Sequence, residues 1–241
     1  MDMPTEVQHQ AMGYDRAATM FSPEGHLLQV EYAEKTVRLG SSSIGIVCSD
    51  GVLVAADRRV RDILIYPESA NKVYEIDEHI VSTAAGILAD ARILVENAQV
   101  LAQQNRVTFN SPIEPISVIK MICDKKQMAT QYGGLRPYGV AFLVGGVNKG
   151  KAQLYTSDVT GNFFQYKANA IGDYDEQIKE MLRKEYNENL TIEDGIEFAL
   201  KIFKKILGKN FNVERFDIGY IKKSNEKLVR MHGNSLKKYV K

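Results

Sequence analysis

The residue types that most often carry chemistry are few in this chain. Its four histidines stand far apart, with no spacing typical of a metal site: His9, His26, His79 and His232. The sequence contains no phosphate-binding P-loop, no dinucleotide fingerprint and no Gly-x-Ser-x-Gly turn that would present a nucleophile. What remains is the serine-rich segment from Gly40 to Gly45, in which Ser41 directly follows a glycine. We therefore predict neither a metal nor a cofactor, and this segment holds the chemistry still to be explained.

The cysteines and the chain start bear on the compartment. Cys48 and Cys123 lie far apart, both in apolar segments. A disulfide between them is possible in principle, but two buried thiols in a reducing compartment fit the pattern better. The first fifteen residues have neither a basic start nor an apolar stretch, and no apolar run approaches the ~20 residues that span a bilayer. We expect a cytoplasmic protein without a secretory signal.

The composition excludes several classes of protein. Among 241 residues, 31 are Lys or Arg and 30 are Asp or Glu, which leaves a formal net charge of +1. This balance gives no broad electrostatic attraction to nucleic acid or to a membrane surface. Hydrophobic residues make up 44% and charged residues 25%, values typical of a globular protein with a sizeable core.

The first predicted element is a helix from about Leu27 to Leu39, because apolar residues recur there at three- and four-residue spacing. A turn at residues 21–25 precedes the helix, and Gly40 ends it. Strands and helices then follow in groups. Hairpins are predicted over 44–56, 72–84, 140–156 and 216–231, a short strand pair over 163–171, and helix pairs over 87–101 with 116–129 and 178–186 with 191–207.

The order of these elements predicts the fold class. Paired helices are inserted twice into a set of antiparallel hairpins, which argues against parallel βαβ winding. Several strands are apolar on more than one face, so both faces of each sheet should be covered. We predict a single α+β domain of four layers, with two antiparallel sheets between two helical layers. No low-complexity linker divides it.

Three separated segments resemble proteasome α subunits of the archaeal type. They are Tyr14-Asp15-Arg16 with Phe21-Ser22-Pro23-Glu24-Gly25 and Gln29-Val30-Glu31-Tyr32-Ala33, then Gln131-Tyr132-Gly133-Gly134-Leu135-Arg136-Pro137-Tyr138-Gly139, then Tyr166-Lys167-Ala168-Asn169-Ala170-Ile171-Gly172. The resemblance runs from about residue 14 to the end. It implies the four-layer N-terminal nucleophile hydrolase fold, which agrees with the layers predicted above.

This resemblance implies a function in a large assembly. Proteasome α subunits form seven-membered rings that cap rings of β subunits, and the α ring controls the entry of unfolded polypeptide and docks a regulatory ATPase. The active sites of this threonine-type endopeptidase lie on the β subunits. For this chain we accordingly expect a gate tail at residues 1–13, a single domain at 14–241 that includes the helix at about 27–39, and no nucleic acid or membrane partner.

An alternative is a catalytic, β-type hydrolase. In β subunits a threonine freed by cleavage after glycine is the nucleophile, its α-amine is the base, and an acidic residue and a lysine support it. Ser41, Asp57 and Lys72 can be laid onto that arrangement, with residues 1–40 as a propeptide. Uncleaved Ser41, however, has its nitrogen in a peptide bond, and the preceding residues carry an amphipathic helix that needs burial. We predict that this chain is not itself an enzyme.

The resemblance also assigns roles to single residues. Tyr14, Asp15, Pro23 and Tyr32 match the cluster that holds the gate open. Lys72 matches the lysine that pairs with the C-terminal carboxylate of an ATPase tail, in a docking pocket to which Glu31 and Gly40 are also assigned.

Three further observations concern the turn at 136–139, Asp57 and His26. The turn Arg136-Pro137-Tyr138-Gly139 is expected to brace the gate region, and Asp57 to form a relic ion pair with Arg58 and Arg59. His26 stands where a basic residue is common.

Overall fold

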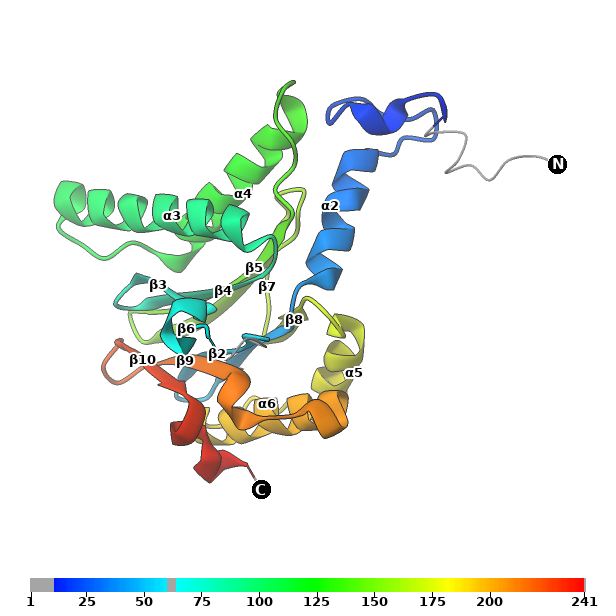
Figure 1. Cartoon of the computed structure of the whole chain (residues 1–241). Helices are drawn as coiled ribbons and strands as arrows, with labels where there is room; N and C mark the ends of the chain where they lie inside the picture. The colour runs from blue at the N-terminus through cyan, green and yellow to red at the C-terminus, as the bar shows by residue number, and fades with distance from the viewer. Residues whose placement is uncertain (1–10, 60–63, 241) are drawn as a thin grey trace.

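The computed structural model describes residues 11–59 and 64–240 (Figure 1). Two five-stranded antiparallel sheets form its centre, one in the order β10-β9-β2-β1-β8 and the other in the order β3-β4-β5-β6-β7. The strands of the first sheet are β1 (Ser43–Cys48), β2 (Gly51–Asp57), β8 (Ala168–Ile171), β9 (Phe216–Lys222) and β10 (Leu228–His232). Those of the second are β3 (Val73–Asp77), β4 (Ile80–Gly86), β5 (Val140–Asn148), β6 (Lys151–Ser157) and β7 (Phe163–Gln165).

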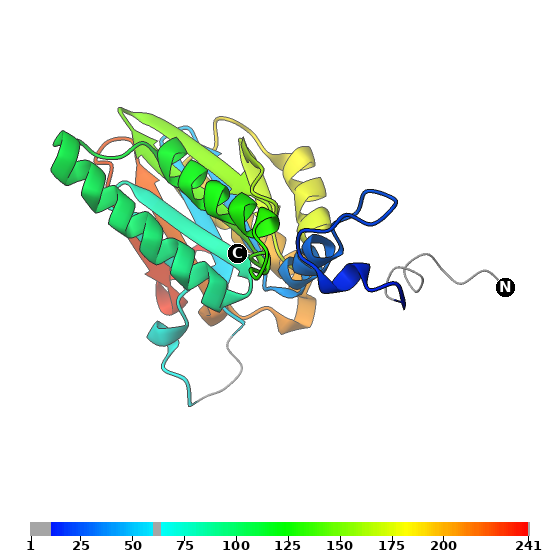
Figure 2. The same cartoon turned by 90° about the horizontal axis from the view of Figure 1, so that it is seen from above.

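Helices cover both outer faces. The long helices are α2 (Leu28–Leu39), α3 (Leu88–Phe109), α4 (Pro115–Gln131), α5 (Asp175–Glu185) and α6 (Ile192–Leu207). Short 3-10 turns lie at Tyr14–Arg16, Pro67–Ala70, Gly208–Asn210, Val213–Arg215 and Gly233–Tyr239. Figures 1 and 2 show α3 and α4 over the sheet that contains β3–β5, and α6 under the other sheet. The predicted α-β-β-α sandwich is confirmed.

The hydrophobic core is divided among the layer boundaries. One apolar cluster joins α5 and α6 to the first sheet, a second joins α3 and α4 to the second sheet, and a third lies between the sheets. Strand β2 shows how the pleat serves two of them. Leu53 and Ala55 face the α5–α6 side, while Val52 and Val54 face the other sheet. Since both faces of β2 are covered, all seven of its residues are buried.

The two strands predicted at 163–171 are present, but they do not pair with each other. Strand β7 pairs with β6 in the second sheet, whereas β8 pairs with β1 in the first. The two residues between them, Tyr166 and Lys167, carry the chain from one sheet to the other. Each continues the hydrogen bonding of one sheet, since the Tyr166 N–H donates to Leu154 O and the Lys167 carbonyl accepts from Val47 N. The short connection between β7 and β8 therefore crosses from one sheet to the other. Each strand adds to a free edge of its own sheet and does not pair with its neighbour in sequence.

Gly40 ends α2 as predicted, but a left-handed backbone is not the reason that this position needs glycine. Its φ of −67° and ψ of 147° are extended values that other residues adopt. A β-carbon at this position would lie 2.3 Å from the backbone nitrogen of Gly86, at the end of β4. Glycine is required because α2 is pressed against that strand. This contact fixes where Ser41 emerges at the start of the first sheet.

Both cysteines are free buried thiols, as expected. Burial raises the pKa of Cys48 to about 12 and that of Cys123 to about 11. Within residues 11–59 and 64–240, no helix has the length and apolarity needed to cross a bilayer.

Candidate functional site

Lys72 joins three segments that lie far apart in the sequence. It directly precedes β3, and its side chain is completely buried. Its ammonium donates to the carbonyl oxygen of Ser41 at 2.8 Å and to the hydroxyl oxygen of Ser41 at 2.7 Å. Its backbone N–H donates to Oδ2 of Asp217, on β9, at 3.0 Å. The structure therefore joins Lys72 to the serine that the sequence singled out.

Two carboxylates near Lys72 are held by arginines. Asp57 receives a two-pronged contact from Arg215, with Nε to Oδ1 at 2.8 Å and NH2 to Oδ2 at 2.6 Å. Asp217 faces Nε of Arg58 at 3.4 Å. The expected pairing of Asp57 with its neighbours was wrong, because Arg59 gives Asp57 only its backbone N–H and sends its guanidinium to Asp173. Arg58 and Arg59 directly follow β2, and their side chains leave the turn in different directions. Arg215, the residue just before β9, contacts Asp57 instead.

This environment shifts the charge state of Lys72. Burial lowers the pKa of the Lys72 ammonium to about 7, with Arg59 adding to the shift and the carboxylates of Asp57 and Asp217 opposing it. Burial also raises the pKa of Asp217 above its usual value. Lys72 is thus a buried cation whose charge changes close to neutral pH.

In the uncleaved chain, the Gly40–Ser41 bond lies between two hydrogen-bonded carbonyls. The Gly40 carbonyl accepts a hydrogen bond from the Asp173 N–H at 2.7 Å, and the Ser41 carbonyl accepts from Lys72. The nitrogen of Ser41 is therefore an amide without a basic lone pair. The lysine and the hydroxyl of an N-terminal nucleophile site are present, and the α-amine that would act as its base would exist only after cleavage behind Gly40. The helix before that bond is packed into the fold, with Leu28, Val30 and Ala33 buried.

The residues assigned to the gate lie around α2. Tyr14 and Asp15 form the short turn before it, and Gln29 on α2 donates to the Asp15 carbonyl at 2.5 Å. Tyr32 lies on α2 with the ammonium of Lys35 5.4 Å from its ring centroid. Oδ1 of Asp15 is buried and has no hydrogen-bond donor among the described residues. Residues 1–10 of the predicted tail lie outside the described residues.

Pro23 lies in an exposed turn before α2. Ser22 closes that turn, since its N–H donates to the His26 carbonyl at 2.8 Å and its hydroxyl accepts from the His26 N–H at 3.1 Å. The turn therefore sets the direction in which the chain reaches the helix.

The docking residues are only partly brought together in one chain. Gly40 adjoins Ser41 and so lies beside Lys72. Glu31 stands nine residues earlier on α2, about 13 Å away at 1.5 Å per helical residue. Its carboxylate contacts Nδ1 of His26 at 2.5 Å, with both side chains largely exposed. A single chain therefore holds Gly40 and Lys72 in one site and Glu31 in another.

The turn Arg136–Gly139 is tied to two helices. Arg136 contacts Asp90, on α3, through two N–H···O contacts of 2.7 Å. Asp90 also accepts from the Gly139 N–H at 3.0 Å, and the Gly139 carbonyl accepts from Thr36 on α2 at 3.0 Å. Burial opposes ionisation of Asp90, but the contacts with Arg136 and Gly139 outweigh it and lower the pKa of this carboxyl group. The sequence analysis missed Asp90 and Thr36, because only the fold brings them to this turn.

Lys126, on α4, is a second buried lysine that the sequence analysis missed. Its ammonium donates to the Ser157 hydroxyl at 2.7 Å and the Asp158 carbonyl at 2.9 Å, and lies 5.0 Å from the Phe142 ring centroid. Burial lowers its pKa to about 7. A signal existed, since Lys126 continues the apolar stripe of Ile119 and Ile122 at helical spacing. Its contacts join α4 to the end of β6, away from the Lys72 site.

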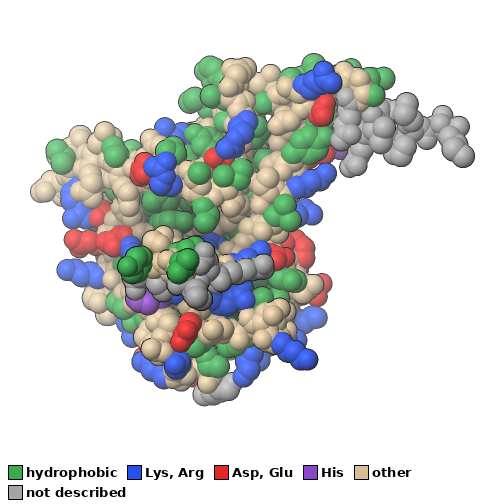
Figure 3. Space-filling model, in the orientation of Figure 1, with side chains coloured by type: hydrophobic (Ala, Val, Ile, Leu, Met, Phe, Trp, Pro, Cys, Tyr) green, Lys and Arg blue, Asp and Glu red, His purple; other side chains and the backbone are tan. Residues whose placement is uncertain are grey.

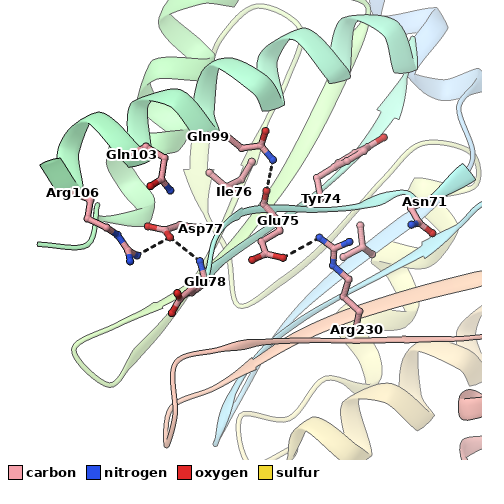
Figure 4. A pocket seen from close by; sticks show the side chains of 11 residues that line it. Asn71, Tyr74, Glu75, Ile76, Asp77, Glu78, Gln99, Gln103, Arg106 and Arg230 are labelled. Atoms are coloured by element: carbon pink, nitrogen blue, oxygen red, sulfur yellow. Dashed lines mark hydrogen bonds and ion pairs between the residues drawn. The ribbon is translucent and has the colours of Figure 1, made fainter. Parts of the chain in front are cut away.

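A cavity of about 650 Å³ lies between α3, β3 and β10, and its lining includes Asn71 and Val73 on either side of Lys72 (Figure 4). Arg106 meets Asp77 there at 2.8 Å, and Arg230 meets Glu75 at 3.3 Å. Its charged groups are largely paired with one another, so it offers no clear chemistry. Among the described residues no group of three or more His, Cys, Asp or Glu could hold a metal ion. Basic and acidic side chains are interspersed on the face in Figure 3, as the small net charge implies.

Comparison with known families decides between the α-type and the β-type interpretation. One family profile, described as "Proteasome subunit", matches residues 37–221, and a second, which describes the N-terminal signature of A-type proteasome subunits, matches residues 14–35. The chain belongs to the proteasome subunit family. It carries the α-type signature over the short turn and most of α2, which supports a non-catalytic α subunit of the proteasome core.

Curated relatives agree over almost the whole length. The chain is 42% identical to the proteasome alpha subunit of Methanococcus maripaludis over 231 residues, which cover 96% of this chain and 89% of the relative. It is 41% identical to the protein of the same description from Archaeoglobus fulgidus over 95% of this chain and 93% of the relative. A Pyrococcus horikoshii relative of that description is 39% identical over 95% and 87%. The resemblance to archaeal α subunits is confirmed.

Two ion pairs on α3 give a test of the brace around Arg136. Asp90 and Glu96 each contact an arginine at 2.7 Å, but the Asp90 side chain is 11% exposed and that of Glu96 is 54% exposed. We expect Asp90→Ala to lower the free energy of unfolding by about 2 kcal/mol, since it loses charged hydrogen bonds in a partly buried site. Glu96→Ala should change it by less than about 0.5 kcal/mol. Urea denaturation of both variants measures the difference, and equal losses would contradict a bracing role.

Proposed function

We propose that this chain forms a seven-membered α ring that controls the entry of unfolded polypeptide into a chamber of catalytic β subunits. The ring also accepts the C-terminal tails of a regulatory ATPase, and the assembled particle degrades proteins in the cytoplasm as a threonine-type endopeptidase. The observation that carries the proposal is the Lys72 site, where a buried ammonium contacts Ser41 and the helix before Ser41 is packed into the fold.

The charge around Lys72 supports docking of an anion. Both nearby carboxylates are engaged by arginines, Asp57 by Arg215 and Asp217 by Arg58, so neither makes a direct side-chain contact with the ammonium. A chain-terminal carboxylate could supply the negative charge that this buried cation lacks, in a charge-assisted hydrogen bond. We assign Gly40 to the same pocket because it precedes Ser41, and Glu31 to a contact that assembly of the ring would bring close.

The structure around α2 supports a gate at the N-terminus. The turn that contains Tyr14 and Asp15 is tied to α2 through Gln29, and α2 is tied through Thr36 to the turn ending at Gly139. The chain before residue 14 therefore starts from a braced position. We propose that Tyr14, Asp15, Pro23 and Tyr32 hold this start in the open arrangement and that the domain at 14–241 carries the tail at 1–13.

An exposed apolar stripe on α3 supports stacking against a β-type partner. Ile93, Val100 and Val107 are 39%, 55% and 87% exposed and recur every seven residues, which places them along one face of the helix. Helix α3 is an outermost element of its layer (Figure 2). Such spacing suits packing against another helix, and we assign this face to the contact between rings.

We expect loss of the Lys72 ammonium to abolish stimulation by the activator. Lys72→Met preserves most of the buried volume but removes the charge, whereas Lys72→Arg retains a cation. Stimulated peptide turnover should fall to the unstimulated level in the first variant and persist in part in the second. Native mass spectrometry checks that both still form rings. Full stimulation of assembled Lys72→Met particles would reject the docking role.

The same site predicts a pH dependence. The Lys72 pKa is lowered to about 7, so the ammonium is fully present below that pH and is lost as pH rises through it. Activator affinity should therefore fall by up to about tenfold per pH unit above 7, until the pH reaches the higher pKa that the ammonium has beside the bound carboxylate. Fluorescence polarisation of a labelled activator tail between pH 6 and 9 measures this. In the Lys72→Arg variant the affinity should be flat, because arginine remains charged.

Deleting residues 2–13 should unblock the pore and raise unstimulated peptide turnover by the assembled particle. The physical reason is that no tail then remains over the axial opening. Turnover of a short fluorogenic peptide measures the change, and a fully unfolded protein substrate provides a second readout. Turnover equal to that of the intact particle would contradict the gate.

The α3 stripe gives a test of assembly. Val107→Asp places a charge on a side chain that is already exposed, so the isolated chain should fold normally. Its association with β subunits should weaken at least tenfold, because the carboxylate would be desolvated at the contact. Val229→Asp, an exposed valine on β10, is the matched control and should assemble. Analytical ultracentrifugation of mixed subunits compares them, and equal assembly would remove α3 from the interface.

A further inference from the structure

The three serines after Gly40 have three different partners. The Ser42 hydroxyl donates to the Asp173 carbonyl, and the Ser43 hydroxyl pairs with Thr83 at 3.0 Å. The Ser41 hydroxyl meets the Lys72 ammonium at 2.7 Å. An ammonium has protons but no acceptor, so in this contact Lys72 donates and the Ser41 oxygen accepts. The Ser41 hydroxyl proton is therefore directed elsewhere, and no acceptor for it is found among the described residues.

Burial places Ser41 in front of Lys72. Lys72 is completely buried, whereas Ser41 is partly exposed. Because the ammonium contacts the Ser41 hydroxyl, an anion bound at this ammonium lies within reach of Ser41 as well. A hydroxyl that accepts from a cation is polarised and becomes a better donor to an anion.

We infer that the Ser41 hydroxyl is a second binding group of the docking pocket, which donates to one carboxylate oxygen while Lys72 donates to the anion. This inference rests on the proposed docking function and identifies a positioning residue within it. The geometry gives Ser41 two tasks. It holds the Lys72 head group through two acceptors, and it supplies a directional donor that recognises a terminal carboxylate and not merely a negative charge.

Other polar groups at this site are already engaged. The Gly40 N–H donates to carbonyls in the last turn of α2 at 3.0 and 3.2 Å. Asp57 and Asp217 are each paired with an arginine. Without those arginines, the negative charges of the two carboxylates would repel an incoming anion. The hydroxyl of Ser42 is occupied by Asp173. Of the three serine side chains after Gly40, only that of Ser41 is in contact with the cation.

The test measures discrimination between a carboxylate and an amide. A fluorescein-labelled heptapeptide with an activator-like apolar C-terminus is made as the free acid and as the C-terminal amide, and each is titrated onto the assembled particle by fluorescence polarisation. The quantity compared is the Kd of the amide divided by the Kd of the acid. The unaltered particle should prefer the acid at least tenfold. Native mass spectrometry confirms that each variant is assembled.

Four variants separate the roles. Ser41→Ala should reduce the discrimination about threefold, Ser41→Thr should retain it because the hydroxyl is kept, and Ser42→Ala should match the unaltered particle. Lys72→Met should bring the ratio close to one. An unchanged ratio in Ser41→Ala, together with loss in Lys72→Met, would overturn the inference and leave the docking function intact. A full ratio in Lys72→Met, or none in the unaltered particle, would overturn the docking function and the inference with it.

Discussion

The structure of the candidate site depends on one buried cation. The Lys72 ammonium lies where the start of β1, the start of β3 and the start of β9 converge, and Ser41 satisfies two of its donors. Burying a charge is costly unless it is hydrogen-bonded, and here the cost appears as a pKa lowered to about 7. The ion pairs that Asp57 and Asp217 make with arginines keep both carboxylates from pairing directly with the Lys72 ammonium. The Lys72 ammonium is therefore held by Ser41 and not by a carboxylate.

Lys126 shows the contrast. It is equally buried and has an equally lowered pKa, but its ammonium lies against a hydroxyl, a carbonyl and an aromatic face within the second sheet's helical layer. Its hydroxyl partner, Ser157, is itself completely buried. Ser41, by comparison, is partly open to solvent. The two lysines thus have similar electrostatics. Lys126 connects two elements of the fold, whereas Lys72 is a candidate docking residue, and they differ in the exposure of the serine that each contacts.

The proposed gate region and the proposed docking site are both connected to α2. One end of the helix carries the turn of Tyr14 and Asp15, and the other ends at Gly40, pressed against Gly86. Between them Thr36 ties the helix to the turn that Arg136 braces against Asp90. A displacement at Ser41 would therefore act on the same rigid helix that positions the chain's start. This arrangement gives a physical route by which an activator at Lys72 could change the entrance.

The sequence by itself determined the layers, the hairpins, the capped helices and the serine after Gly40, because these follow from local periodicity, turn residues and short spacing. It also pointed to the proteasome α family through three local motifs. It could not determine the partner of Asp57, the crossover between β7 and β8, or the brace formed by Asp90 and Thr36, because these join residues far apart in the chain. Only the tertiary structure decided that Lys72 rests on Ser41, 31 residues earlier, since such a contact exists only once two sheets have stacked.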